Sequence, residues 1–173
     1  GMKQLYAFAS SILGDIAHAQ SDDRRAIALV EESLALFRDV GDKWGLAFAL
    51  GILGTMVLAQ GDTGWAMMLL EESLTFRREL GDKYGMIECL EGLAGSAVAQ
   101  GQLEQATRLL GAAAALRQAT GVGLSPRAHA RSERHLSVVQ AGWDEAVFAP
   151  PWTTGQATTL EPLLTCGHQG IVP

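Results

Sequence analysis

The chain carries an internal sequence repeat, and this repeat constrains the fold more than any single motif. The run 13–45 recurs as 53–85, with sixteen of the 33 aligned pairs identical, and a fainter copy follows. The third copy keeps mainly a skeleton of small and apolar positions: Leu93, Ala99, Gln100, Ala106, Leu109, Leu110 and Gly121. A period of this length is typical of stacked units that bury one continuous core.

Within each copy the apolar spacing is helical, and the breaks fall at fixed places. Gly-Asp pairs at 41–42 and 81–82 close the first two copies, where Gly ends a helix and Asp caps the next. A second break lies near the middle of each copy, at 20–23, 60–63 and 100–102. We therefore predict an all-α fold, an α-solenoid of three antiparallel helix pairs at about 2–41, 42–81 and 82–121.

The repeat stops after Gly121, and the rest of the chain is expected to cover the end of the stack. Ser125-Pro126 is a good helix start, and that helix should run to about Gln140. A short helix over 144–148 should end before Pro150-Pro151. We predict capping helices over 122–149, and over 150–173 a tail with little regular structure beyond a brief turn near 159–161.

Composition narrows the classes of function. A net charge of -6 and a pI near 5.1 disfavour a nucleic-acid-binding surface, which needs clustered Lys and Arg. The uncharged run 44–61 imitates a membrane span, but its counterparts in the other copies carry Asp15 and Glu88, so we expect a covered helix and no membrane. Cys89 and Cys166 lack motif spacing and are interpreted as free thiols in a reducing cytoplasm.

Small residues recur where helices must approach closely, and these positions resemble the tetratricopeptide (TPR) repeat. Copy one carries the signature residues Leu13-Gly14, Ala17, Ala26, Val30 and Ser33. The resemblance covers roughly residues 5 to 121. Two departures are a period of 40 in place of the usual 34 or so, and Arg38 and Arg78 where the motif commonly closes with proline.

The long period, with Gly-Asp-Lys between units, is similar to helical arrays of large bacterial regulators. The run 108–117, followed by 121–126, resembles the stretch that ends many such proteins, in which a nucleotide-binding switch and a LuxR-type output accompany the array. This resemblance implies a non-enzymatic interaction domain, the sensor or regulatory arm of a larger transcriptional or signalling protein.

Motifs for catalysis or metal binding are lacking. The sequence has no Gly-Lys-Ser/Thr phosphate loop, no Gly-x-Ser-x-Gly elbow and no His-Glu-x-x-His pattern. His129 and His135 share a predicted helix but lie six residues apart, which places them on different sides. Arg127, Arg131 and Arg134 share one face, which we interpret as solvated in preference to an anion site. We expect no enzyme, metal or cofactor.

The predicted binding surface rests on the resemblance, because the first helix of each TPR pair lines the concave face of the array. The TPR groove that clamps a peptide carboxylate uses Asn and Lys, and this chain has no Asn. An apolar groove with an acidic end suits an amphipathic helix or an apolar peptide of a protein partner. The implied lining residues are Phe8, Ser11, Asp15, His18, Phe48, Gly51, Thr55, Leu58, Glu88, Glu91, Gly95 and Val98.

Three alternatives remain open at this point. Phe8 and Phe48 could simply pack between neighbouring helices. The groove could close around an apolar small-molecule effector, which would make the domain a sensor. The array could also serve as a homodimerisation arm, because the first helix is expected to expose an apolar face around Leu5, Phe8 and Ile12.

Overall fold

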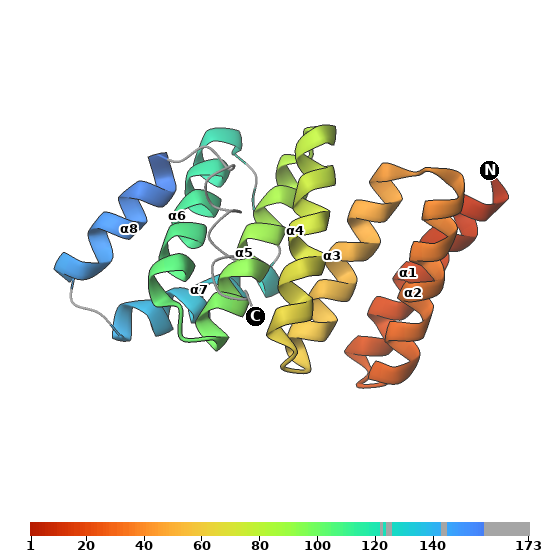
Figure 1. The fold of residues 1–173 in the computed structure, drawn as a ribbon, viewed down its shortest axis with the longest axis horizontal. Coiled ribbons are helices and arrows are strands. Elements are labelled where there is room, and N and C mark those ends of the chain that lie inside the picture. The colour runs from red at the N-terminus through yellow and green to blue at the C-terminus, as the bar shows by residue number, and fades with distance from the viewer. Residues whose placement is uncertain (122, 124–125, 143–144, 158–173) are drawn as a thin grey trace, which may run out of the picture. The chain divides into compact units, whose positions relative to one another are not determined.

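The computed structural model describes residues 1–121, 123, 126–142 and 145–157, and throughout these residues the regular structure is helical (Figure 1). This confirms the all-α prediction. The helices in chain order are α1 (Met2–Ala19), α2 (Asp23–Val40), α3 (Lys43–Ala59), α4 (Thr63–Leu80), α5 (Lys83–Ala99), α6 (Leu103–Thr120), α7 (Pro126–Ala141) and α8 (Glu145–Ala157).

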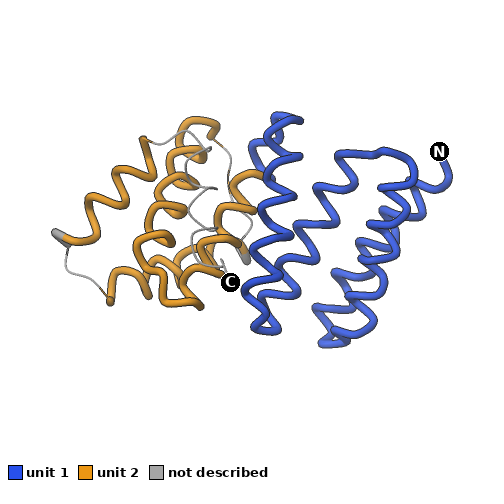
Figure 2. Tube along the Cα trace, in the orientation of Figure 1, with its two compact units in different colours: residues 1–85 blue, residues 86–173 orange. Residues whose placement is uncertain are grey.

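The chain forms two compact units, Gly1–Gly85 and Met86–Pro173 (Figure 2). In unit 1, α1 packs on α2, α3 packs on α4, and α3 also contacts both α1 and α2. In unit 2, α6 contacts α7 and α8. None of the helices in the described ranges combines the length and apolarity that a membrane crossing needs.

The turns form as the repeat pattern predicts. Gly41, Gly81 and Gly121 end α2, α4 and α6 in the left-handed conformation, with φ between 67° and 69°. Only glycine adopts this conformation without strain from a Cβ atom. Asp42 and Asp62 then cap α3 and α4 by accepting a hydrogen bond from a backbone N–H of the first turn.

Small residues allow the close helix approaches that the repeat predicts. A Cβ atom on Gly14 would lie 2.6 Å from Cγ2 of Val30, and one on Gly54 would lie 2.8 Å from Cγ of Leu70. Contacts this short require the neighbours to move. Between these approaches the core of unit 1 is filled by apolar side chains that are almost fully buried: Val30, Leu34, Phe37, Leu50, Leu53, Met56, Val57 and Leu70.

The start of α7 at Pro126 agrees with the prediction, whereas the predicted end of the last helix is wrong. That helix was expected to stop before Pro150-Pro151, with an irregular tail from 150, but α8 includes both prolines and ends at Ala157. Its packing gives the reason. Phe148 stacks on Trp152 across the prolines, at a centroid distance of 5.4 Å. This contact lies within α8, and the packing of α8 on α6 adds tertiary contacts that outweigh the local preference of proline.

Two glycines set how closely α8 approaches α6. A Cβ atom on Gly155 would lie 2.1 Å from the carbonyl oxygen of Arg108, and one on Gly111 would lie 2.5 Å from that of Trp152. Neither contact could form with a larger residue, because backbone atoms cannot move aside as a side chain can. The turn predicted at 159–161 and the residues Cys166 and His168 lie outside the described residues, while Cys89 is a buried free thiol.

Candidate functional site

Two of the predicted binding residues of unit 1, Phe8 and Phe48, form an aromatic cluster with Phe37 and Trp44. Phe8 on α1 lies 4.7 Å from Phe37 on α2, 5.3 Å from Trp44 and 6.1 Å from Phe48, measured between ring centroids. Trp44 stacks on Phe48 at 5.5 Å with 9° between the ring planes. The helices α1 and α3 therefore join through aromatic side chains.

The solvent exposure of the four aromatic side chains increases from the core to the surface. Phe37 is completely buried, Phe8 and Phe48 are half-buried, and Trp44 is 49% exposed. Phe8 and Phe48 thus pack between helices, as one alternative held, and still offer part of their surface to solvent. The cluster forms a continuous aromatic surface whose inner side is anchored by Phe37.

The other predicted residues of α1 are tied to α2 in different ways. Ser11 is buried and shares a short hydrogen bond with Ser33. Nδ1 of His18 lies 2.7 Å from a carboxylate oxygen of Asp23, so this ring links the end of α1 to the start of α2. Asp15 is exposed. Of these three predicted residues, Asp15 alone lies open to an external ligand.

The predicted residues of α3 form a half-buried row. The Thr55 hydroxyl donates to the carbonyl oxygen of Ile52 at 2.8 Å, and Leu58 is half-buried. Gly51 lies against a guanidinium group, because a Cβ atom there would sit 3.1 Å from Nη2 of Arg77. The absent side chain at Gly51 leaves room for that buried arginine.

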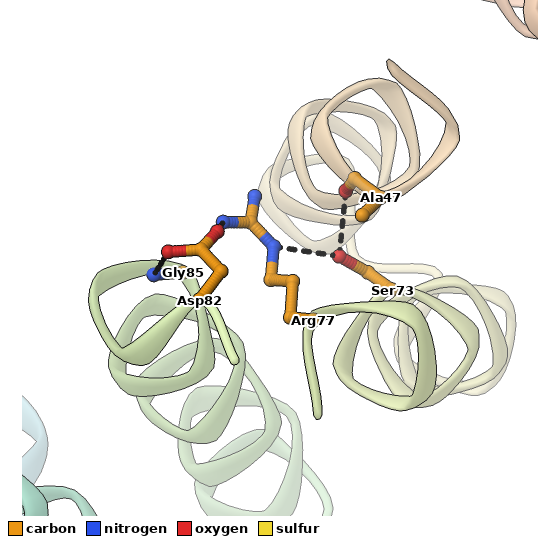
Figure 3. A network of polar contacts seen from close by, with 5 residues as sticks. All are labelled: Ala47, Ser73, Arg77, Asp82 and Gly85. Carbon is orange, nitrogen blue, oxygen red and sulfur yellow. Dashed lines mark hydrogen bonds and ion pairs between the residues drawn. The ribbon is translucent and has the colours of Figure 1, made fainter. Parts of the chain in front are cut away.

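Arg77 is the centre of a polar network that the sequence interpretation missed (Figure 3). Its Nε donates to the hydroxyl of Ser73 at 3.1 Å, and its Nη1 donates to Asp82 at 2.9 Å. The Ser73 hydroxyl in turn donates to the carbonyl oxygen of Ala47 at 2.7 Å, and the other Asp82 oxygen accepts from the backbone N–H of Gly85 at 3.0 Å. The network joins α3, α4 and the start of α5.

The repeat itself contained a signal for this network. Position 77 corresponds to Phe37 in copy one, a fully buried residue. An arginine at such a position is buried too, and only 8% of the Arg77 side chain is exposed. Positive charge is also favourable in the last turn of a helix, where Arg77 lies, so its place in α4 does not by itself indicate burial. The apolar residue Phe37 at the aligned position is therefore the sequence signal that indicates an internal group at position 77.

In unit 2 the predicted residue Glu91 is completely buried and lies inside a charged cluster. Its Oε1 accepts a hydrogen bond from Nη1 of Arg117 at 2.9 Å, while its Oε2 has no hydrogen-bond partner. Burial raises the pKa of Glu91, and Arg117, a hydrogen bond from Ser132 and the charge of Arg131 partly offset that rise. The side chain is therefore closed to an external partner.

The helix α7 supplies much of this cluster. Ser132 and Arg131 both act on the Glu91 carboxylate, so this side of α7 faces α5. His135, one turn further along α7, is half-buried, and its pKa is lowered by burial and by Arg131 and Arg134. The predicted solvated face of Arg127, Arg131 and Arg134 is thus only partly correct. Arg134 is exposed, Arg131 is half-buried, and the Arg127 side chain lies outside the described residues.

The remaining predicted residues in unit 2 are buried or half-buried. Gly95 is buried, and Glu88 and Val98 are half-buried. The structure brings Glu88 close enough to Glu91 for its charge to raise the pKa of Glu91. Within the described residues no group of three or more His, Cys, Asp or Glu side chains is placed to hold a metal ion. The predicted residues therefore include a half-buried aromatic pair in unit 1, Phe8 and Phe48, and the buried carboxylate of Glu91 in unit 2.

Comparison with known proteins assigns neither a family nor a function to this chain. No protein-family model matches the chain, and no curated protein matches its sequence.

Proposed function

We propose that this protein is a non-enzymatic helical-repeat scaffold that binds an amphipathic helix of a protein partner against the faces of α1 and α3 in unit 1. The observation that carries the proposal is the aromatic cluster, with Trp44 about half exposed and stacked on Phe48. Exposed aromatic side chains on a rigid base are the usual anchors of protein recognition. The half-buried Phe8 and the fully buried Phe37 form that base, since Phe8 packs on both Phe37 and Trp44.

In unit 2, α7 shows how a helix can pack against the first helix of a repeat, as the proposed ligand would in unit 1. Glu91 occupies the repeat position of Ser11 and Gly51, and α7 brings Ser132 to it. The first helix of a repeat thus receives another helix at this position. In unit 1 the equivalent residue Ser11 is buried and bonded to Ser33, so recognition there would depend on the partly exposed aromatic cluster. Asp15, exposed on α1, would orient a basic flank of the ligand.

The finer architecture belongs to the same proposal. Three antiparallel helix pairs stacked as a TPR-like solenoid agree with the recurrence of left-handed glycines at the aligned repeat positions 41, 81 and 121. The close approaches at Gly14 and Gly54, which are also aligned repeat positions, agree with it as well. We further propose that the protein acts in the cytoplasm as the regulatory arm of a bacterial transcriptional or signalling protein, in line with the resemblance of its long repeat.

A peptide titration tests the binding proposal. The probe is a synthetic amphipathic helix with Leu at positions i, i+3, i+4 and i+7 and a Lys-rich flank, and the readout is an NMR titration of the tryptophan indole N–H signals. We expect the Trp44 signal to shift saturably and Trp44→Ala to weaken binding at least about 10-fold, which corresponds to the loss of one aromatic anchor.

Trp65 on α4 is the matched control, because it is also exposed but does not belong to the aromatic cluster. Trp65→Ala should bind the peptide as the wild type does. Equal weakening by both substitutions, or a Trp44 signal that stays unchanged up to about 1 mM peptide, would refute the proposal.

A further inference from the structure

One side of α1 is an exposed apolar stripe, formed by Met2, Leu5, Tyr6, Ile12, Leu13 and Ile16 with Ala9 in its middle. We call this surface the α1 stripe. Each of its six large residues is about half exposed or more, and no other described helix carries more than three exposed large apolar side chains. At 100° per residue the seven positions fall within one side of the helix. The stripe contains no charged residue.

The repeat shows what kind of surface the α1 stripe is. Leu13 is 49% exposed, whereas Leu53, at the same repeat position in α3, is 2% exposed. The pairs Tyr6 and Leu46, and Ile16 and Met56, show the same contrast. In α3 these positions face a packed interior, because α2 and α1 lie against that helix. The α1 stripe therefore has the composition of a helix–helix interface that lacks its second helix.

We propose that the occupant is the α1 stripe of a second copy of this chain, packed antiparallel across a two-fold axis near Ala9. Three features favour a second copy. The stripe carries no charge that would repel its own counterpart, although each chain has a net charge of -6. Ala9 lies at mid-length, where a small side chain lets two helices approach. Leu5 and Leu13 stand four residues to either side of Ala9, so the stripe is apolar toward both ends.

The size of the surface sets the strength of the pair. An 18-residue helix is about 27 Å long, and two such helices bury on the order of 1,000 Å² in total. This area lies at the low end for a specific interface, so the dimer should dissociate in the micromolar range. The two-fold arrangement makes the interface closed, and association stops at two copies.

Sedimentation velocity on the whole chain, from about 1 to 200 μM, tests the dimer. The wild type should shift from monomer to dimer over this range. Leu5→Glu/Ile12→Glu should weaken the dimer at least about 10-fold, since it places charges in an apolar interface. Met68→Glu on α4 is the control, because Met68 is 68% exposed outside the stripe, and it should dimerise as the wild type does.

Circular dichroism spectra and thermal melts of the two variants should match those of the wild type, since the substituted residues are exposed. A wild type that stays monomeric throughout would overturn the proposal. A folded double variant that dimerises like the wild type would overturn it as well, because the interface would then lie elsewhere.

A thiol cross-link tests the position of the two-fold axis. In a Cys166→Ser background, Ala9→Cys should give a disulfide-linked dimer on mild oxidation with diamide, because the introduced thiols face each other near the axis. The exposed residue Thr75 on α4 provides the control Thr75→Cys, which should stay largely monomeric. Equal cross-linking at both sites, or none at position 9, would overturn the arrangement.

Discussion

The ion pair between Glu91 and Arg117 makes a sharp prediction, because one partner is far more buried than the other. Glu91 is completely buried, while 26% of the Arg117 side chain is exposed. Arg117→Met keeps most of the aliphatic stem and removes the charge. The Glu91 carboxylate then remains buried with only Ser132 and the more distant charge of Arg131 to stabilise it.

The expected cost follows from this geometry. Removing one member of a buried ion pair costs about 3–5 kcal/mol of unfolding free energy. Ser132 and Arg131 still act on the carboxylate, so we expect the lower end, about 3 kcal/mol at neutral pH. Glu91→Gln should cost much less, because a neutral amide avoids the desolvation that dominates this site, and the partly exposed Arg117 still reaches water.

The pH dependence has a definite sign. The pKa of Glu91 is raised in the folded state, so the folded protein holds this proton more tightly than the unfolded chain does. Stability from this proton is fully present below the ordinary carboxyl pKa and is lost as pH rises through the raised value. Arg117→Met removes an attraction that lowers the pKa, so the raised value moves higher still.

Urea unfolding monitored by far-UV circular dichroism at neutral and mildly acidic pH measures these effects. The deficit of Arg117→Met relative to the wild type should shrink as the pH falls and Glu91 takes up its proton. In the Glu91→Gln background, Arg117→Met should cost little and show no such pH dependence. A deficit below about 0.5 kcal/mol at neutral pH, or one that grows on acidification, would refute the reasoning.

Two further stability predictions follow from unit 1. Gly54→Leu should destabilise the fold by about 1–3 kcal/mol or more, because the added Cβ atom would already lie 2.8 Å from Cγ of Leu70. Glu72→Ala on the exposed side of α4 should change the melting temperature little. The reverse ranking of the two variants would contradict the helix register. In chemical denaturation, the unfolding free energy of Arg77→Phe should stay within about 1.5 kcal/mol of the wild type. Arg77→Ala should lower it by about 2–4 kcal/mol, because this substitution leaves a cavity. Equal losses in the two variants would show that the position requires the charge.

The sequence predicted those parts of the fold that local chemistry determines. The helix ends at Gly41 and Gly81 and the cap at Asp42 depend on residues within one turn of each other, and these features were predicted correctly. The close approaches at Gly14 and Gly54 followed from the repeat, because aligned small residues indicate aligned contacts.

The sequence did not predict the features that depend on distant contacts. The extension of α8 through Pro150 depends on the close fit of α8 to α6, which no local pattern indicates. The stack of Phe148 on Trp152 adds a contact within α8 itself. The enclosure of Glu91 likewise requires Ser132, which lies two helices further along the chain, on α7. The exposed Phe8, Trp44 and Phe48 surface was only partly predicted, because Trp44 was not among the proposed lining residues.

One repeat position links the core to the candidate site. Phe37, Arg77 and Arg117 occupy the same place in successive copies, and the first helix of each copy carries Ser11, Gly51 or Glu91 at a second aligned position. Phe37 supports the aromatic cluster, Arg77 lies against Gly51, and Arg117 pairs with Glu91.

These paired changes give the copies different interiors at these two positions, aromatic in the first copy and charged in the second and third. The ring of Phe37 supports Phe8, so an arginine at position 37 would remove this support from the cluster. Copy one contributes Phe8 and Phe37 to that cluster, and copy two contributes Trp44 and Phe48. The repeat therefore preserves the backbone and varies the pair at these two positions. Under the proposed function, a ligand would select unit 1 because the partly exposed aromatic cluster lies there.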